Sequence, residues 1–573
     1  MIKKHNIYNI FNILRPYKRN ITWISILMLI TAVGSFLTPW LTKSLIDEGI
    51  INKEYRKVIF YVGVIIAVFF IQQIFEILQF HLYSKICIRI PYDLNIKACK
   101  QVLTVKIKYF KERNFSEVLS EIFQDIATIS SIADSQFLAS VVNLIKILAG
   151  IIALFLISWK LTILLLLVIP IRVLISRFMY ISQRNKFKEL MDNQSKFSSW
   201  LGDGISGIVE IKLWGMIKEK MIEVEKILTK FSITKKRLLF LGQIDKISNG
   251  FLSIGFNCLI YLVGASLIIK NEMTLGGLFS FVSYSALVME PITIMSYIST
   301  QLSSIIPAYE RFSTFLQTDK EEDNEFAIEF KDTQVYKMSF ENISLAYSNE
   351  YVLSDISFDI FKGEKVAIIG ANGSGKTSLI NLLLRFYAPT TGTIKINDKK
   401  IEEFTLESYR KLFNLMAQSN YLFNDSIYNN INLTGELSWE EIKAACVEAE
   451  AYDFINNLPE NFNARVGYNG AKLSGGEKQK IALARTLAKR NSRILILDEA
   501  TSNYDYKSEA EFNDKVMLSK QYDIIIMITH RPEILKKINK IIYLDKGKVI
   551  AVGNYDSLYR DYESFRNTIL KEN

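Results

Sequence analysis

Six long apolar stretches dominate the chain before about residue 310, and polar segments separate them. They are Ile21–Thr42, Val58–Phe75, Phe137–Trp159, Leu161–Ser176, Ile247–Ile269 and Thr274–Pro307. A helix that crosses a membrane needs roughly 20 predominantly apolar residues. Within the stretches only Lys146, Arg172 and Glu290 are charged. The pattern therefore predicts an all-α membrane domain of six helices over residues 21–309.

The polar segments alternate between short and long. Asp47–Lys57, Lys160 and Lys270–Met273 are short, whereas His81–Gln136 and Arg177–Lys246 are long and rich in Lys and Arg. Cytoplasmic segments of membrane proteins carry an excess of these basic residues. The long segments, and with them both termini, are therefore predicted to lie in the cytosol.

The first 20 residues are polar and basic and show no cleavable signal peptide. Ile7, Ile10, Phe11 and Leu14 recur at helical spacing within them. A short amphipathic helix with one apolar face lies in the membrane interface. Residues 1–20 are therefore predicted to form a cytosolic amphipathic elbow ahead of the first span, although an ordinary soluble helix has the same pattern.

Charge and cysteine content narrow the class of protein. The net charge of +10 reflects Lys and Arg in the segments between spans, which favours a membrane protein over a nucleic-acid-binding protein. The four cysteines form no C-x-x-C pair, so neither a zinc site nor a disulfide framework is indicated. The richness in Ile, Lys and Asn is typical of a low-GC bacterium, which points to a bacterial cytoplasmic membrane.

The pattern of apolar and polar residues changes after the last span. Residues 310–335 include an acidic, polar run and are predicted to be a linker. Beyond them, short β-rich runs at Lys365–Ile369, Arg493–Leu497 and Ile524–Ile528 alternate with helical patterns such as Thr377–Arg385. This alternation predicts an α/β nucleotide-binding domain over residues 336–573.

A glycine-rich loop follows the first of these strands. Residues Gly370–Thr377 read G-A-N-G-S-G-K-T and fit the pattern G-x-x-x-x-G-K-[ST] between a strand and a helix. In such a P-loop, backbone N–H groups and the helix N-terminus surround phosphate. Lys376 is expected to reach the β- and γ-phosphates, and the Thr377 hydroxyl to bind Mg²⁺. The loop alone does not choose among kinases, GTPases and transporters.

Two acidic residues end a second apolar strand, in the sequence I-L-I-L-D-E at residues 494–499. A buried strand that delivers a carboxylate beside a P-loop is a typical means of holding Mg²⁺. Asp498 is therefore predicted to bind the metal, and Glu499 to polarise the attacking water. Without the P-loop, the same residues would read as a solvated acidic turn.

A third motif, L-S-G-G-E at Leu473–Glu477, gives the chain its resemblance to a family. With it, the sequence resembles the ABC ATPases over essentially the whole chain. The resemblance implies that the motif begins a helix and closes on the γ-phosphate of ATP held by the opposite subunit. A Ser hydroxyl, glycine N–H groups and a helix dipole suit that role.

Other motifs fall in the family order. Tyr347 resembles the aromatic residue that stacks on adenine, and Gln418 resembles the glutamine that touches Mg²⁺ and the membrane domain. Asp505 resembles the aspartate after the second acid, and His530 the histidine that contacts the γ-phosphate. The resemblance thus implies a competent ATP site with Mg²⁺ bound by Thr377, Gln418 and Asp498, and with Glu499 and His530 as catalytic residues. The expected ATP contacts are Tyr347, Gly370, Ala371, Asn372, Gly373, Ser374, Gly375, Lys376, Thr377, Ser378, Gln418, Ser474, Gly475, Gly476 and Asp505.

Two loops depart from the family pattern. The residues before Asp505 read Ser-Asn-Tyr in place of the commoner Ser-Ala-Leu. Val466–Gly470 reads V-G-Y-N-G and lacks the Glu and Arg of the exporters' V-G-E-R-G. Contacts across the dimer and between this loop and the membrane domain are therefore expected to differ from those of the family.

Six spans ahead of one ATPase domain resemble an ABC exporter half-transporter. The segments Tyr109–Arg113 with Asp125, and Gly207–Lys212, resemble its two cytosolic coupling regions, and Ser158–Thr162 resembles a short outer turn. Because the signature acts across subunits, the resemblance implies a dimer with two ATP sites. A homodimer is favoured, although a heterodimer fits the same sequence.

Candidate substrate contacts are polar residues inside or beside the spans. Gln72, Glu76 and Gln79 fall on one helical face, and Glu290 precedes Pro291 in the sixth span. Intramembrane charges commonly face a cavity or a partner. These residues therefore predict a polar or cation-binding cavity wall, or alternatively pairing with Lys146 or Arg172, or a place near the membrane boundary.

The sequence thus predicts ATP-driven export of an amphipathic substrate, namely a peptide, lipid or drug, by alternating access. Two alternatives remain open at this point. One is ATP-driven uptake of a metal chelate by the same fold, and the other is a regulatory or channel-like ABC protein gated by ATP.

Overall fold

The computed structural model describes residues 12–111, 115–347, 350–418, 420–499 and 506–571. The chain divides into two compact units. The first comprises Met1–Val105 and Tyr109–Lys320, and the second comprises Lys106–Lys108 and Glu321–Asn573. One is helical and the other combines helices with two sheets, which confirms the predicted fold class.

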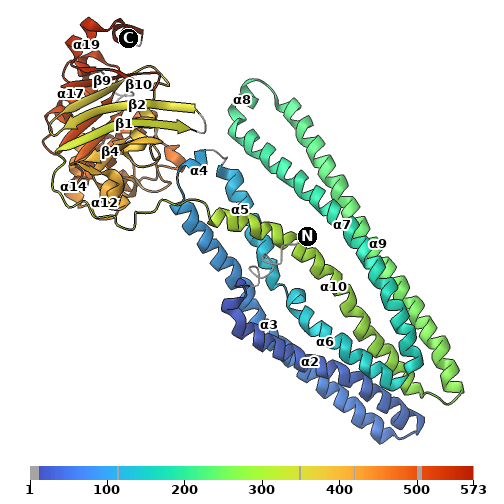
Figure 1. Cartoon of the computed structure of the whole chain (residues 1–573). Helices are drawn as coiled ribbons and strands as arrows, with labels where there is room; N and C mark the ends of the chain where they lie inside the picture. Colours follow the sequence, from blue (N-terminus) through green and yellow to red (C-terminus); the bar gives the residue numbers. More distant parts are fainter. Residues whose placement is uncertain (1–11, 112–114, 348–349, 419, 500–505, 572–573) are drawn as a thin grey trace. The chain divides into compact units, whose positions relative to one another are not determined.

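Long helices build the first unit (Figure 1). They are α2 (Lys18–Ser44), α3 (Tyr55–Thr104), α6 (Ser135–Ile157), α7 (Trp159–Ser206), α9 (Ile217–Ile269) and α10 (Leu275–Leu316). The shorter helical segments are η1 (Arg15–Tyr17), η2 (Leu45–Ile51), α4 (Lys108–Lys111), α5 (Phe115–Ser130), η3 (Ser131–Ala133) and α8 (Ile208–Leu213). Four of the six predicted spans lie inside one of the long helices. The predicted span Phe137–Trp159 extends past the end of α6 at Ile157 to the first residue of α7, and Thr274–Pro307 begins one residue before α10.

Several of these helices are much longer than the spans predicted within them. α3 has 50 residues and α9 has 53. The polar segments that the sequence separated from the spans are largely continuations of the same helices, because Lys, Glu, Gln and Leu support a helix in water as well as in lipid. α10 likewise ends at Leu316, so the predicted linker 310–335 begins inside its last turns.

The length of the apolar stretches shows which helices could cross a membrane. Among the described residues, the helical stretches Arg15–Ile51, Tyr55–Thr104, Trp159–Ser206 and Ile217–Ile269 are long and apolar enough to cross a bilayer, and α6 and α10 contribute the shorter apolar stretches Val142–Ile157 and Leu275–Met289. No residue of the most apolar window of α3 is buried within the chain. Such an apolar surface requires lipid or another protein to cover it.

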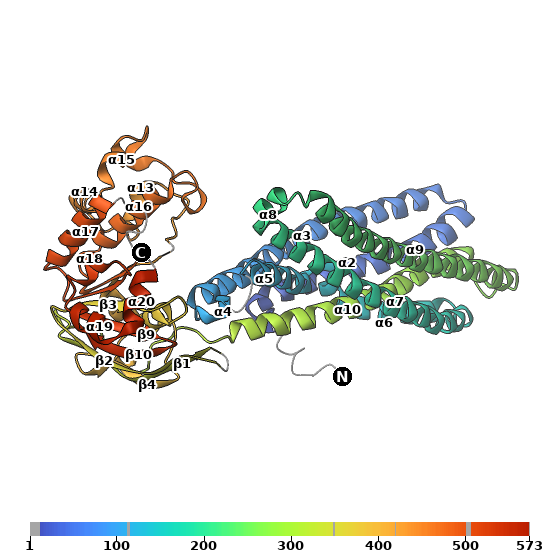
Figure 2. The same cartoon turned by 90° about the horizontal axis from the view of Figure 1, so that it is seen from above.

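Two apolar clusters hold the helical unit together. One joins α2, α3, α5, α6 and α10 around residues such as Ile86, Ile129 and Ile305, and the other joins α6, α7, α9 and α10 around Leu161 and Phe281. α7 runs along α9, and α2 runs along α3 (Figures 1 and 2). α5 is fixed to α10 by Arg311, whose Nε donates a hydrogen bond to Asp125 Oδ2 at 3.0 Å.

Two sheets form the frame of the second unit (Figure 2). The strands are β1 (Lys337–Tyr347), β2 (Glu350–Phe361), β3 (Lys365–Ile369), β4 (Thr391–Ile396), β5 (Lys399–Lys400), β6 (Phe413–Met416), β7 (Ile494–Asp498), β8 (Ile524–Ile528), β9 (Lys540–Asp545) and β10 (Lys548–Gly553). One sheet is antiparallel, with the order β2-β1-β4-β5. The other has the order β10-β9-β3-β8-β7-β6, with parallel pairing from β9 to β6.

Helices cover the larger sheet. They are α11 (Lys376–Leu383), α12 (Leu406–Lys411), α13 (Ile427–Ile431), α14 (Trp439–Glu448), α15 (Tyr452–Asn456), α16 (Gly475–Ala488), α17 (Tyr506–Leu518), α18 (Pro532–Leu535), α19 (Tyr555–Asp561) and α20 (Glu563–Lys571). Side chains alternate across each strand, so Val366 and Ile368 join one buried cluster while Ala367 and Ile369 join another. A parallel sheet buried on both faces explains the continuous apolar runs in the sequence.

Candidate functional site

The P-loop lies between β3 and α11. Gly375 adopts a φ of +104° and immediately precedes the first residue of α11. At Gly370, a Cβ would lie 2.2 Å from the carbonyl oxygen of Leu544 and 2.4 Å from Ser374 Oγ. Only glycine fits so close an approach. The loop is therefore a tightly turned cradle at a helix N-terminus, which is where protein backbones bind phosphate.

Two side chains in the loop complete this cradle. Lys376 Nζ donates hydrogen bonds to the carbonyl oxygens of Gly370 at 2.5 Å and Ala371 at 3.2 Å, which holds its ammonium over the loop. The Ser374 hydroxyl is buried and has no hydrogen-bond partner among the described residues. Buried polar atoms are nearly always paired, so an unpaired hydroxyl inside a phosphate cradle is an observation that fits a bound phosphate. Ala371, Asn372, Gly373 and Thr377 lie on the exposed side of the loop.

The two acids stand at the end of β7. Burial raises the pKa of Asp498, the neighbouring charge of Glu499 adds to the rise, and the Lys376 ammonium opposes it. Glu499 adopts a φ of +50°, and its N–H donates to the carbonyl oxygen of Ile528 at 3.1 Å. Asp498 and Lys376 are thus electrostatic neighbours, as the predicted ATP site requires.

Gln418 contacts the second acid directly. Its Nε2 donates to Glu499 Oε2 at 2.8 Å. From α16, Gln479 Nε2 donates to the Glu499 carbonyl oxygen at 3.4 Å. Glu499 is therefore held from both sides, and its carboxylate lies in hydrogen-bond reach of the predicted metal-contacting glutamine.

The strand order places His530 at the same edge of the larger sheet as the P-loop and Asp498. β8 lies between β3 and β7, and His530 follows β8 by two residues. The carboxyl ends of adjacent parallel strands meet at one edge of a sheet, where ligands bind in α/β proteins. Gly370, Asp498 and the half-buried His530 are therefore gathered at one edge.

An aromatic pair flanks the P-loop. Tyr347 ends β1, and its hydroxyl donates to Ser378 Oγ at 3.4 Å. Its ring packs edge-on against Tyr387, with centroids 5.1 Å apart and planes at 75°. The sequence interpretation missed Tyr387. Its position just after α11, in the run Arg-Phe-Tyr, could have signalled a residue near the loop.

The signature motif begins α16 as expected. Ser474 is the N-cap, and its Oγ accepts a hydrogen bond from the Glu477 N–H at 3.3 Å. In return Glu477 Oε2 accepts from the Ser474 N–H and hydroxyl, each at 2.8 Å, which forms a capping box. Ser474 and Gly475 are exposed and Gly476 is half-buried. The helix thus presents a polar N-terminus to its surroundings.

The loop before the signature has a definite structure. Gly467 and Asn469 adopt positive φ values of 76° and 47°, and Lys478 Nζ donates to Asn469 Oδ1 at 2.9 Å. Tyr468 is 76% exposed. Asp505 and the Ser-Asn-Tyr residues before it lie outside the described residues.

The oxygen donors at the site suit Mg²⁺. This ion prefers carboxylate, hydroxyl and phosphate oxygens and is usually held by one or two protein ligands together with the nucleotide. Asp498, Thr377 and Gln418 offer such oxygens. In the described part of the chain no group of three or more His, Cys, Asp or Glu side chains could hold a metal ion. The donors present therefore fit a metal that arrives with ATP.

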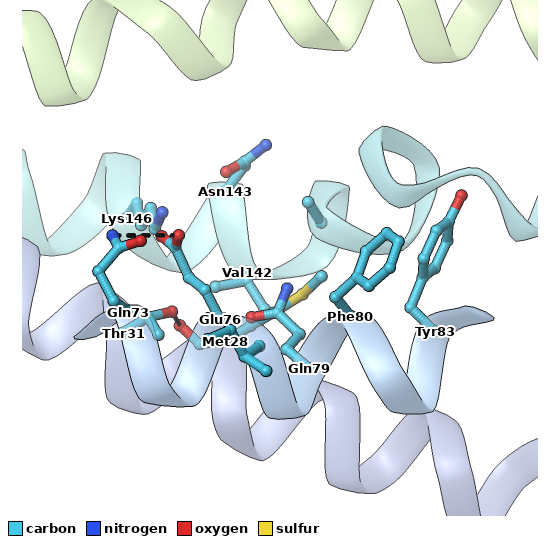
Figure 3. Close-up of a pocket in the computed structure, with 12 residues that line it drawn as sticks. Met28, Thr31, Gln73, Glu76, Gln79, Phe80, Tyr83, Val142, Asn143 and Lys146 are labelled. Carbon is cyan, nitrogen blue, oxygen red and sulfur yellow. Dashed lines mark hydrogen bonds between the residues drawn. The ribbon is translucent and has the colours of Figure 1, made fainter. Parts of the chain in front are cut away.

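A second concave site lies in the helical unit, where α2, α3 and α6 surround a cavity of about 530 Å³ (Figure 3). Its lining mixes apolar with charged and amide side chains. They are Met28, Thr31, Gln73, Glu76, Ile77, Gln79, Phe80, Tyr83, Ala139, Val142, Asn143 and Lys146. We call this cavity the α2–α3–α6 pocket.

The pocket contains two of the four predicted substrate residues. Glu76 and Gln79 line it, together with Gln73, Asn143 and Lys146, which the sequence interpretation did not propose as substrate contacts. Gln72 does not line it, because its Nε2 donates to the Thr31 carbonyl oxygen at 3.2 Å and contacts Ser35 Oγ at 3.5 Å, which ties α3 to α2. The side chain of Glu290 lies outside the described residues.

Comparison with known proteins finds two family matches along the chain. The family described as ABC transporter transmembrane region matches residues 21–292, and the family described as ABC transporter matches residues 353–502. An ATP-dependent lipid A-core flippase of Thiobacillus denitrificans is 26% identical over 563 residues, covering 97% of this chain and 96% of its own. A putative export ATP-binding/permease protein of Rickettsia bellii is 27% identical over 575 residues, covering 99% and 98%.

The fold also matches a solved structure. The structure of a bacterial Atm1-family ABC exporter with ATP bound superposes with a TM-score of 0.86 at 21% sequence identity, and covers 97% of this chain and 99% of that one. Its similarity extends over both units of the present chain. At this identity the likeness shows the fold.

A multi-pass helical unit joined to a P-loop ATPase with a signature helix defines an ATP-driven membrane transporter. The chain belongs to the ABC transporter family as an exporter-type half-transporter, with its membrane domain fused ahead of its ATPase domain. Its ATPase is coupled to transport, and half-transporters of this family function as dimers.

Proposed function

We propose that this chain exports an amphipathic substrate across a bacterial cytoplasmic membrane, with the ATPase domain and both termini in the cytosol. The observation that carries this proposal is the α2–α3–α6 pocket, in which charged and amide groups share a wall with apolar side chains inside or just beyond predicted spans. Pockets of 300–1,000 Å³ suit ligands of drug-like size. Among peptides, lipids and drugs, the relatives named lipid A-core flippases favour a lipid.

The exposed signature supports a dimer in which each ATP is shared. Lys376 and the P-loop of one chain hold the phosphates, and Ser474 of the partner subunit supplies a hydroxyl at the N-terminus of α16. In one chain this helix N-terminus is exposed, and among the described residues the Ser474 hydroxyl is bound only within its own capping box. An intact site permits a homodimer, which is the simplest assembly.

Each side chain of the site has a role in hydrolysis. Tyr347 stacks on adenine, supported by Tyr387, and Glu499 orients the attacking water and accepts its proton. His530 contacts the γ-phosphate, and Thr377, Asp498 and Gln418 would hold Mg²⁺. When bound, Mg²⁺ neutralises part of the phosphate charge.

Export follows from a two-state equilibrium. ATP can favour the closed dimer only by binding it more tightly than the open one, and contacts from both subunits to one nucleotide supply that difference. Closure draws the cytosolic ends of the long helices together, and hydrolysis removes the shared contacts. The cavity is thereby exposed to each side of the membrane in turn.

The test is reconstitution of the purified chain in lipid vesicles, with ATP-dependent movement measured for fluorescent lipids, peptides and amphipathic drugs. We expect movement of at least one class, and its loss in Glu499→Gln while ATP binding persists. ATP hydrolysis without movement of any class would contradict the proposal. ATP-dependent accumulation of a metal chelate in the opposite direction would favour uptake.

A further inference from the structure

Two opposite charges face the α2–α3–α6 pocket without neutralising each other. Glu76 comes from α3 and Lys146 from α6 (Figure 3). Lys146 forms no ion pair within the described residues, and Glu76 accepts one long hydrogen bond, from Gln73 Nε2 at 3.4 Å. Charged groups at membrane depth are costly unless they are paired or solvated. The pocket thus holds a cationic and an anionic group that both remain available to a ligand.

Amide groups extend this polar wall. Asn143 is only 8% exposed, lines the pocket, and makes no hydrogen bond among the described residues. A buried amide is normally paired, so this side chain has donors and an acceptor left for a ligand or for water. Gln79 adds a second amide from α3. These groups can both donate to an anion and accept from an ammonium.

Apolar side chains stand beside the polar wall. Ile77 and Phe80 line the pocket and are 68% and 67% exposed, so they face outward from the chain while bordering the polar groups. A ligand with hydrocarbon chains would leave those chains against such a surface. The pocket is therefore suited to the polar end of an amphiphile rather than to a wholly polar molecule.

Depth along the helices agrees with a headgroup site. Met28 follows the start of the first predicted span by seven residues, which is roughly 10 Å along a helix. Glu76 is 18 residues past the start of the second span, about 27 Å across a hydrocarbon core of roughly 30 Å. Both positions fall in the half of the membrane on the predicted cytosolic side.

We propose that the α2–α3–α6 pocket binds the zwitterionic headgroup of a lipid, with the ligand ammonium at Glu76 and its phosphate or carboxylate at Lys146. An anionic headgroup would leave Glu76 unpaired, and a cationic one would leave Lys146 unpaired. The pocket therefore selects against both. This inference rests on the proposed export function, since it names the class of substrate that the exporter takes from the inner leaflet.

The test uses the purified full-length chain in detergent without ATP. Binding is measured by calorimetry for dioctanoyl phosphatidylethanolamine, for its anionic phosphatidylglycerol analogue, and for a cationic dioctanoyl trimethylammonium lipid. We expect the zwitterion to bind about tenfold more tightly than either singly charged lipid, because one charge-assisted contact is lost in each case. Equal affinities for the three lipids would overturn the proposal without any variant being needed.

Variants then assign the two charges. Glu76→Gln should shift the preference to the anionic lipid, Lys146→Gln should shift it to the cationic lipid, and the reversal Glu76→Lys with Lys146→Glu should restore zwitterion binding. Glu272→Gln is the matched control, because this exposed carboxylate pairs with Lys160 and lies outside the pocket. A reversed pair that stays inactive while folding normally would contradict the assignment, as would an equal effect of the control.

Further measurements distinguish a lipid from a soluble ligand, and distinguish failure of the pocket assignment from failure of the export proposal. Free phosphoethanolamine carries the same charges without chains, so binding as tight as that of the lipid would identify a soluble ligand and refute the lipid assignment. Export that proceeds in vesicles while the three lipids bind equally would refute only the pocket assignment. Selective zwitterion binding without ATP-dependent movement of any substrate would refute the export proposal.

Discussion

Loss of Arg311 should expose the energetic cost of a buried carboxylate. The Asp125 side chain is only 6% exposed, whereas that of Arg311 is 59% exposed. Two guanidinium nitrogens reach the two carboxylate oxygens, with Nε 3.0 Å from Oδ2. Arg311→Met therefore leaves a charge on α5 without the partner that ties it to α10.

The magnitude follows from this unequal burial. Removing one partner of a fully buried pair costs about 3–5 kcal/mol. Because water reaches the Arg311 side, we expect about 1.5–3 kcal/mol for Arg311→Met, which lowers the unfolding midpoint by roughly 3–6 °C. The double variant Asp125→Asn with Arg311→Met removes the charge as well, and should be more stable than Arg311→Met alone.

The effect should depend on pH. Burial raises the pKa of Asp125, while the hydrogen bond and charge of Arg311 oppose the rise. Removing Arg311 raises the folded-state pKa further. A carboxyl with a higher pKa in the folded state binds more protons when folded, so stability falls as pH rises above the ordinary Asp value near 3.9. The loss in Arg311→Met should be larger at pH 8 than at pH 5.

Thermal unfolding of the detergent-purified chain, followed by intrinsic fluorescence at both pH values, measures these changes. Lys57→Met is the control, because the Lys57–Glu54 pair lies in the same unit but is exposed to water and should contribute little to stability. The reasoning is refuted if Arg311→Met loses no more than the control, or if the double variant is the less stable of the two.

Three further predictions concern the ATP site. Glu499→Gln should reduce ATP turnover by at least about a hundredfold while nucleotide binding survives, and near-normal hydrolysis would rule out Glu499 as the base. Gly370→Ala should abolish ATP binding, because the new Cβ would overlap the Leu544 carbonyl oxygen. In Gly373→Ala the new Cβ meets nothing within 4 Å, so this variant should cost only about 1–2 kcal/mol of backbone strain. Titration with a fluorescent nucleotide compares the two affinities, and tighter binding by Gly370→Ala than by Gly373→Ala would contradict the loop geometry. Tyr387→Leu should raise the KM for ATP about two- to tenfold with kcat unchanged, from loss of the ring pair with Tyr347, and a fall in kcat alone would point to another role.

Most of the correct predictions came from residue patterns within single strands and helices. The strands around Lys365–Ile369 and Ile524–Ile528 were confirmed because parallel strands buried on both faces require continuous apolar runs. The helical extensions of the spans were missed, since a hydropathy pattern marks where lipid ends and not where a helix ends. The capping box at Ser474 and Glu477 was readable as S-x-x-E but was interpreted only as a phosphate signature.

Contacts between distant segments could not be read from the pattern. Gln72, Gln73 and Glu76 occupy neighbouring helical positions, yet Gln73 and Glu76 line the pocket while Gln72 binds the backbone of α2. The difference depends on how α3 is rotated against α2 and α6. The same limit applies to Tyr387, whose partner Tyr347 is 40 residues earlier in the chain.

The length of α3 has a mechanical consequence. Its 50 residues extend about 75 Å, of which the hydrocarbon core covers only about 30 Å. Pro91 lies within α3 and is a position where a helix can bend. When the helix moves as one body, a tilt of about 5° around its outer end displaces the other end by about 6 Å. A small tilt can leave the apolar contacts at the outer end of α3 intact. The same tilt moves the far end of the helix by more than the length of one helical turn.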